Sequence, residues 1–141
     1  MGGEPVADPA TDLRTGPSWP EPAPRAELDT YIPRTGMAVL HVVGEIDHVE
    51  ARVVQIRLIE LLRAPDAQVV VLDLSRVTFM GSHALTAVVQ AQRVAAELGR
   101  TLRGITGDGN RAVMRPVRMT GLDWVIEWFP GLPEAISQSS R

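Results

Sequence analysis

Residues 69–85 read VVVLDLSRVTFMGSHAL, and this stretch gives the strongest indication of the fold. Its first four residues, Val69 to Leu72, form a continuous apolar run rich in β-branched side chains, which is typical of a strand covered on both faces of a parallel sheet. We expect a central strand there, followed by a loop over 74–81. Ser82 stands where that loop ends and the next helix begins. The stretch therefore predicts a strand, a loop and a helix in sequence, with a hydroxyl group at the start of the helix.

On both sides of this stretch, patterns typical of strands alternate with patterns typical of helices. Apolar residues recur every three or four positions in the helical segments, whereas the strand segments are short apolar runs bounded by turn residues. The predicted elements are a hairpin of 30–33 and 37–43, a helix over 49–62, the central strand, a helix over 84–98 capped by Gly99, a strand over 101–105, a helix over 110–119, a strand over 125–129 and a terminal helical piece over 132–137. Such alternation implies parallel strands joined by right-handed crossovers. The predicted fold class is α/β, with a mostly parallel sheet, an N-terminal antiparallel strand and packed helices.

The first predicted helix has an unusually wide apolar stripe. The stripe consists of Val49, Val53 and Ile56 together with Val54, Leu58, Leu61 and Leu62. Because charged residues lie between these positions, we expect the helix to pack one face on the sheet.

Length and composition limit the number of domains and the kinds of partner. A chain of 141 residues fits one domain of ordinary size. Residues 1–29 are rich in proline, alanine and acidic side chains and are predicted to be a disordered tail, the domain is predicted to span 30–137, and 138–141 are predicted to be a disordered C-terminus. Trp19 in the tail is either a docking anchor or a loosely packed residue.

Charge and residue usage exclude several classes of function. The formal net charge of −3 gives no general attraction to nucleic acid. The chain has no cysteine, which excludes disulfides, thiol nucleophiles and thiolate metal sites. No stretch reaches the roughly 18–20 apolar residues of a bilayer span, and the N-terminus lacks the pattern of a signal peptide. We therefore expect a cytoplasmic protein that binds neither nucleic acid nor membrane.

Functional loops in a parallel α/β sheet gather at the carboxyl ends of the strands. Three predicted loops fall there, over 44–47, 74–81 and 107–110. Ser82 begins the helix after the middle loop, so its hydroxyl is expected either to cap that helix or to accept a phosphate that faces free backbone N–H groups. A phosphate there would change the surface charge and leave the fold standing.

The stretch over 69–85 resembles the signature of the STAS domain, a module shared by sulfate transporters and anti-sigma factor antagonists. The family pattern is a hydrophobic strand ending in Asp-Leu-Ser, then Val-x-Phe, then Asp-Ser-x-Gly-Leu. Three further segments resemble the family in the same order, namely GMAVLHVVGEIDHVEA from Gly36, AAELGRTL from Ala95 and MTGLDWVIEWFPGLPEAI from Met119. The similarity covers roughly Tyr31 to Ile136.

This resemblance implies a mechanism. In the antagonist branch of the family, the unphosphorylated domain binds an anti-sigma factor that is also a serine kinase, and so frees a bacterial sigma factor for transcription. Phosphorylation of the loop serine, which Ser82 matches, breaks the complex, and a phosphatase is a further candidate partner. The chain departs from the pattern at Gly81, where the family has aspartate, and at Ala84, where it has glycine. These departures favour the alternative of an interaction or ligand-binding module that phosphorylation does not control.

The expected partner-binding face combines residues from the first two loops and the start of the second helix. Its residues are Glu45, Asp47, Asp73, Ser75, Thr78, Gly81, Ser82 and His83. Asp73 is expected either to orient the loop or to be satisfied by backbone donors, and Ser75 and Thr78 are nearby hydroxyls that could replace Ser82.

The sequence gives little support for an enzyme or a cofactor. Ser82 and His83 are adjacent at a helix start and point in different directions, so His83 is poorly placed as a base. His41, His48 and His83 are not at metal-ligand spacing. No catalytic residue, metal or cofactor is therefore predicted.

Two basic or glycine-rich features admit a functional and a structural interpretation. The Gly107-Asp108-Gly109 turn lacks the lysine of a P-loop and is either a phosphate site or a plain turn. The helix that follows carries arginines at helical spacing, which form either a docking stripe or a solvated face. These arginines are Arg111, Arg115 and Arg118.

Overall fold

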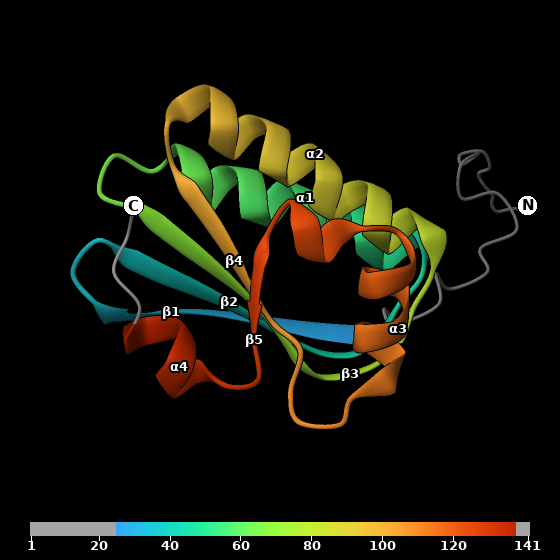
Figure 1. Cartoon of the computed structure of the whole chain (residues 1–141). Helices are drawn as coiled ribbons and strands as arrows, with labels where there is room; N and C mark the ends of the chain where they lie inside the picture. Colours follow the sequence, from blue (N-terminus) through green and yellow to red (C-terminus); the bar gives the residue numbers. More distant parts are fainter. Residues whose placement is uncertain (1–24, 138–141) are drawn as a thin grey trace, which may run out of the picture.

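The computed structural model describes residues 25–137, which form a five-stranded sheet flanked by helices (Figure 1). The strand order is β1-β2-β3-β4-β5, with β1 antiparallel to β2 and the other neighbours parallel. The elements are β1 (Ala26–Arg34), β2 (Met37–Ile46), α1 (His48–Arg63), β3 (Val69–Met80), α2 (Ser82–Leu98), β4 (Thr101–Ile105), α3 (Arg111–Met119), the 3-10 helix η2 (Leu122–Trp124), β5 (Glu127–Phe129) and α4 (Leu132–Ser137). The α/β class, the antiparallel first strand and the central position of β3 are confirmed.

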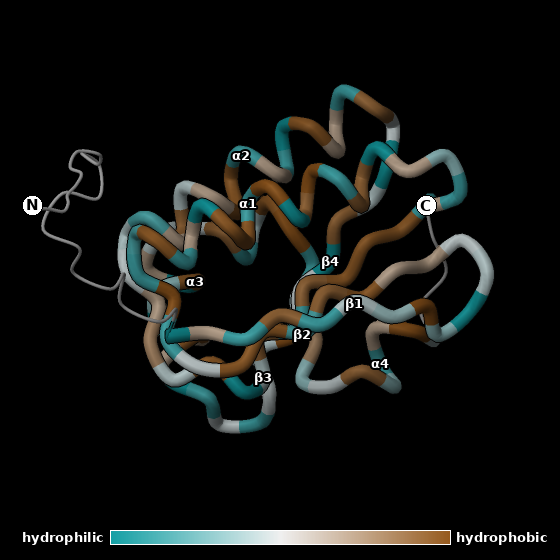
Figure 2. Tube along the Cα trace, turned by 180° about the vertical axis from the view of Figure 1, so that it is seen from behind, coloured by the Kyte–Doolittle hydropathy of each residue, from teal (hydrophilic) through white to brown (hydrophobic). Residues whose placement is uncertain are grey.

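The two faces of the sheet are covered unequally. Helices α1 and α2 lie side by side over one face, and the short helix α4 lies on the other (Figure 1). Along β3, Val70 and Leu72 point into the larger core with α1 and α2, while Val69 and Val71 point into the smaller core with α4. Figure 2 shows the hydrophobic residues of the strands between these helical layers. The apolar run over 69–72 is continuous because both of its faces are buried.

The helix predictions are confirmed, with one correction to the first. Gly99 ends α2 in the left-handed conformation at φ 66°, as a C-terminal cap requires. In α1, only part of the apolar stripe packs on the sheet. Val54, Leu58 and Leu62 are buried, whereas Val49, Val53 and Ile56 are exposed. A stripe this wide exceeds the face that a helix can bury against a sheet.

Several strand boundaries differ from the prediction, and β2 continues to Ile46, so residues 44–46 of the predicted loop over 44–47 belong to that strand. Strand β1 begins at Ala26, so the residues from 26 to 29 that were assigned to the tail belong to an edge strand. Pairing with β2 extends the strand through its polar residues, because an edge strand needs only one buried face and Ala26 supplies a buried anchor opposite Gly44. At the other end, β5 begins at Glu127 because η2 takes up the preceding residues.

The largest correction concerns the middle loop. The segment over 74–80 is not a loop but the second half of β3. It stays paired with β2 as far as Ile46 and Met80, with two shifts of register in which β3 carries one more residue than β2. These are β-bulges, which bend a strand and redirect its side chains.

None of the helices formed by residues 25–137 is long and apolar enough to cross a membrane. The predicted disorder of 1–24 and 138–141, and the two interpretations of Trp19, lie outside the described residues.

Candidate functional site

The site is built on the part of β3 that extends beyond its neighbour β4. Pairing between β3 and β4 ends at Asp73 and Ile105, whereas pairing with β2 continues to Met80. Beyond that point the side chain of Asn110, which precedes α3, takes the place of β4. Its Nδ2 donates to the carbonyl oxygens of Leu74 at 3.2 Å, Ser75 at 3.3 Å and Val77 at 3.0 Å. The segment that leads to Ser82 is therefore hydrogen-bonded on both sides. In the sequence, Asn110 was distinguished only by its position at the end of a glycine turn before a helix.

Asp73 fixes the first bulge rather than facing a partner. Its side chain is buried, Oδ1 accepts the N–H of Ser75 at 3.0 Å, and Oδ2 lies 2.9 Å from Nδ1 of His41. Of the two alternatives that the sequence left open, the carboxylate is satisfied by a backbone donor, the N–H of Ser75, and by His41. Ser75 in turn packs against the loop after β4, because a Cβ on Gly107 would come within 3.0 Å of Ser75 Cα.

Ser82 is the first residue of α2, and its hydroxyl does not cap the helix. The N-cap residue is Gly81, with extended φ and ψ of −82° and 176°, and the helix start has no side-chain capping bond. The capping role that the sequence allowed for Ser82 is therefore wrong, because a cap must sit one residue earlier, outside the helical turn. Ser82 is exposed, and its carbonyl accepts the Thr86 hydroxyl at 3.2 Å. Its own hydroxyl is left at the N-terminus of a helix, where a negative charge is stabilised.

The start of α1 lies next to the start of α2. Gly81 donates its N–H to the carbonyl of Ile46 at 3.0 Å, and a Cβ at position 81 would lie 3.4 Å from Oδ1 of Asp47. Asp47 is the N-cap of α1 and forms a capping box with Glu50. This places Asp47, Gly81 and Ser82 at one edge of the molecule.

Glu50 links the backbone at Arg25, just before β1, to this edge. The backbone N–H of Arg25 donates to Glu50 Oε2 at 2.9 Å and that of Asp47 to Oε1 at 3.0 Å. The bond from Arg25 is the main cause that lowers the pKa of the buried Glu50 carboxyl, against the opposing effect of burial. Glu45 is exposed beside it and forms a surface ion pair with Arg25 at 3.5 Å.

The structure thus divides the predicted partner-binding residues into two groups. Asp47, Gly81, Ser82 and His83 lie together at the starts of α1 and α2, with Glu45 on the adjoining end of β2. Thr78 is exposed on β3, while Asp73 is buried and Ser75 is half-buried behind the edge. Of the two alternative hydroxyls, Thr78 is the more accessible.

A groove between α1 and α2 opens beside Ser82 and was missed by sequence reasoning. The rings of His48 and His83 lie 5.6 Å apart across it. The groove has a volume of about 330 Å³ and is lined by His48, Ala51, Arg52, Gln55, His83 and Thr86. The only sequence signal was the helical spacing of the α1 residues, which does not say what they face.

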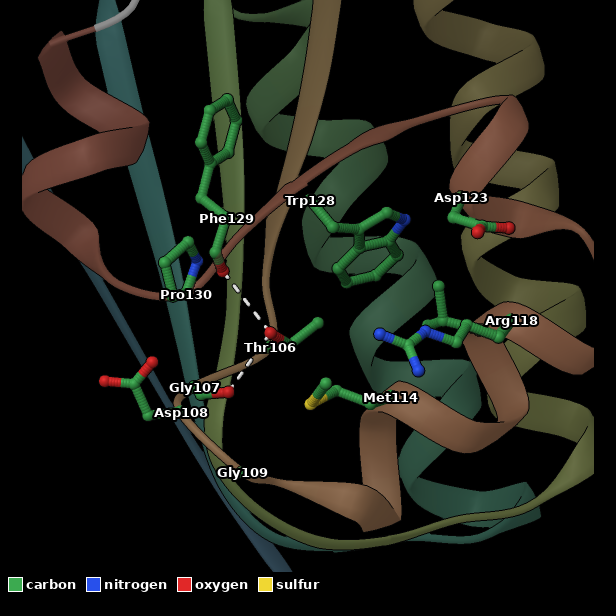
Figure 3. Close-up of a pocket in the computed structure, with 11 residues that line it drawn as sticks. Thr106, Gly107, Asp108, Gly109, Met114, Arg118, Asp123, Trp128, Phe129 and Pro130 are labelled. Atoms are coloured by element: carbon green, nitrogen blue, oxygen red, sulfur yellow. Dashed lines mark hydrogen bonds between the residues drawn. The ribbon is translucent and has the colours of Figure 1, made fainter.

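The glycine turn after β4 borders a second pocket of about 330 Å³ (Figure 3). Gly107 and Gly109 have positive φ values of 85° and 66°, as a tight turn requires. In Figure 3, Met114 and the Trp128 ring face the pocket, and Arg118 is the single cationic side chain that lines it. Because Gly107 contacts Ser75 and the turn positions Asn110, its visible role is to support β3.

No group of three or more potential metal ligands occurs among residues 25–137. His41 is engaged with Asp73, and the pair of His48 and His83 has no third ligand beside it.

Comparisons with known proteins agree with the resemblance seen in the sequence. A family model described as "Mlab, STAS domain" matches residues 33–127. The anti-sigma-F factor antagonist RsfB of Mycobacterium tuberculosis is 29% identical over 116 residues, which cover 82% of this chain and 91% of that protein. The crystal structure of an anti-sigma factor antagonist from Mycobacterium paratuberculosis has a TM-score of 0.71 at 26% identity, covering 82% of this chain and 95% of that one. SpoIIAA of Bacillus in its phosphorylated form shares the fold, with a TM-score of 0.61 at 14% identity over 78% of this chain and 96% of that one.

Proposed function

The chain belongs to the STAS domain family, and we propose that it is an anti-sigma factor antagonist switched by phosphorylation at Ser82. In this proposal it binds an anti-sigma factor of the serine kinase type in the cytoplasm and thereby frees a sigma factor. The observation that carries the proposal is the position of Ser82, which matches the family's loop serine, is exposed, and keeps its hydroxyl free of a capping bond. The names of RsfB and of the Mycobacterium paratuberculosis protein support the antagonist role.

The surroundings of Ser82 suit a reversible phosphate. At the first helical residue the added charge faces the positive end of α2, a stabilising effect of about 0.3–1 kcal/mol at an exposed site. This is too small to reorganise the fold, whereas up to two negative charges on an exposed surface strongly change what can dock there. Kinase and phosphatase partners would both need the exposed position that Ser82 has.

The same geometry argues for a binding protein rather than a hydrolase. His83 faces His48 across the groove, with the ring centroids 5.6 Å apart. Because adjacent residues at a helix start point in different directions, His83 is poorly placed as a base for Ser82. We therefore assign no catalytic role to either residue.

A second candidate function is a STAS interaction or ligand-binding module that phosphorylation does not control. It is favoured by Gly81, because the family's aspartate before the serine is missing and a kinase would lose an acidic neighbour. An aspartate would fit the backbone at 81, but its carboxylate would lie close to that of Asp47. The departure at Ala84 has a structural reason, since this methyl group is buried in the larger core.

The test is a pull-down from lysate of the native host with three baits, namely wild type, Ser82→Asp and Ser82→Ala. Phosphate on the recovered wild-type bait is mapped by mass spectrometry. We expect wild type and Ser82→Ala to retain a kinase-fold anti-sigma factor and Ser82→Asp to lose it. Equal retention of that partner by all three baits would support the second candidate function instead.

A further inference from the structure

The groove between α1 and α2 is cationic on a protein whose net charge is negative. Arg52 and the two histidines His48 and His83 line it, together with the amide of Gln55 and the hydroxyl of Thr86. None of its lining residues is a carboxylate, although the formal net charge of the chain is −3. The arginine, imidazole and amide groups that line this groove match the hydrogen-bonding needs of a carboxylate.

An exposed apolar stripe on α1 adjoins this groove. Val49, Val53 and Ile56 have exposed fractions of 54%, 42% and 54%. Residues three and four apart are neighbours on a helix, so Arg52 lies next to both Val49 and Ile56. The cationic groove and the apolar stripe are therefore continuous, with Arg52 at their junction.

Resting on the proposed function, we propose that this groove and stripe form the docking surface for a segment of the anti-sigma factor that carries a carboxylate flanked by apolar side chains. The carboxylate enters the groove and pairs with Arg52, while the apolar side chains cover Val49, Val53 and Ile56. A salt bridge at the groove mouth would set the register of the segment, and the apolar contact would supply most of the buried area.

This surface also explains how a phosphate on Ser82 would release the partner. Ser82 is the first residue of α2 and directly precedes His83, which lines the groove, so a phosphate on the serine would lie within one residue of that lining. A phosphate there competes with the partner's carboxylate for the same donors. The switch is therefore competition for one anion site, and it requires no change of fold.

The experiment measures binding of purified full-length variants to the purified anti-sigma factor recovered in the pull-down. The test variants are Arg52→Glu, which reverses the groove charge, and Val53→Asp, which charges the stripe. Their matched controls are Arg115→Glu on α3 and Val125→Asp after η2, two exposed positions away from the groove. Thermal unfolding of all four variants verifies that each is folded.

We expect both test variants to weaken binding by about tenfold or more, which is the loss of one charge-assisted or apolar anchor contact. The controls should remain within about twofold of wild type. Arg52→Glu and Ser82→Asp disable the same anion site. The affinity of the double variant should therefore be close to that of whichever single variant binds less tightly.

The outcomes separate the two proposals. If Ser82→Asp abolishes binding while Arg52→Glu and Val53→Asp bind like their controls, the docking surface is wrong and the antagonist role stands. Independent, additive effects of Arg52→Glu and Ser82→Asp would overturn the shared anion site. If the wild-type chain retains no anti-sigma factor at all, the proposed function fails and this inference fails with it.

Discussion

Replacing Asn110 tests whether one side chain holds the segment that leads to Ser82. The amide nitrogen donates to the carbonyl oxygens of Leu74, Ser75 and Val77 at 3.0–3.3 Å, in the region where β3 has no pairing with β4. The variant Asn110→Ala removes these donors and leaves the rest of the loop in place. We expect the second half of β3 to lose order on its α3 side.

The size of the effect follows from the number of hydrogen atoms. The amide nitrogen carries two, so the three contacts correspond to two hydrogen bonds with some sharing. Each is worth about 1 kcal/mol net, and half-buried carbonyls left without donors add to the loss. We expect Asn110→Ala to lower the free energy of unfolding by about 2–3 kcal/mol, and the melting temperature by about 10 °C for a domain of this size.

Asn110→Asp is the matched variant, because it keeps the shape and turns the donor into an acceptor facing carbonyl oxygens. The new carboxyl favours its protonated form, which can still donate, so its pKa in the folded state should exceed that of the unfolded chain. The stability of Asn110→Asp relative to wild type should therefore be highest below about pH 4 and fall as the pH rises through the raised value.

Urea denaturation at several pH values measures the stability of both variants, and hydrogen exchange measures protection of the amides from 74 to 80. The reasoning is refuted if Asn110→Ala unfolds within about 0.5 kcal/mol of wild type and protects the segment equally well. It is also refuted if Asn110→Asp shows no extra loss between pH 4 and pH 7.

The remaining predictions concern packing, pH and the helix start. Gly104→Ala should cost about 1–3 kcal/mol, because its Cβ would lie 2.2–2.7 Å from three atoms of the Trp128 ring, and both urea denaturation and tryptophan fluorescence should report the displaced ring. Glu50→Gln should flatten the acid limb of the stability curve: the lowered pKa of Glu50 makes wild type lose stability as the pH falls below the ordinary value of 4.5, and parallel curves for the two proteins would contradict this. Ser82→Ala should change the free energy of unfolding by less than about 0.5 kcal/mol, because no cap bond is lost; a loss above about 1 kcal/mol would restore the capping interpretation.

The sequence predicted the order of elements well because most of them have simple burial patterns. The second half of β3 was missed since its buried residues are Leu74, Val77 and Met80, a spacing of three where a regular strand gives two. Each bulge adds one residue and so resets the alternation. The apolar residue Phe79 is exposed at 47%, which breaks the alternation further, so the segment resembled a loop.

The candidate site was only partly predictable for a different reason. The motif located Ser82, but whether a serine caps a helix depends on which residue has extended backbone angles, and that residue is Gly81. The groove joins His48 to His83, which are far apart in the chain and meet only because α1 and α2 lie side by side. Tertiary packing also decided which half of the apolar stripe on α1 became buried.

The two bulges of β3 limit how this segment can change in evolution. Between Asp73, which is buried, and Gly81, which is bonded to Ile46, the two bulges and the pairing with β2 fix which residues are buried and which are exposed. Deleting or inserting one residue would move Leu74, Val77 and Met80 out of the core or shift Ser82 away from the start of α2. Substitutions can therefore accumulate at an exposed position such as Arg76, whereas the number of residues between Asp73 and Ser82 should stay constant among proteins that keep this site.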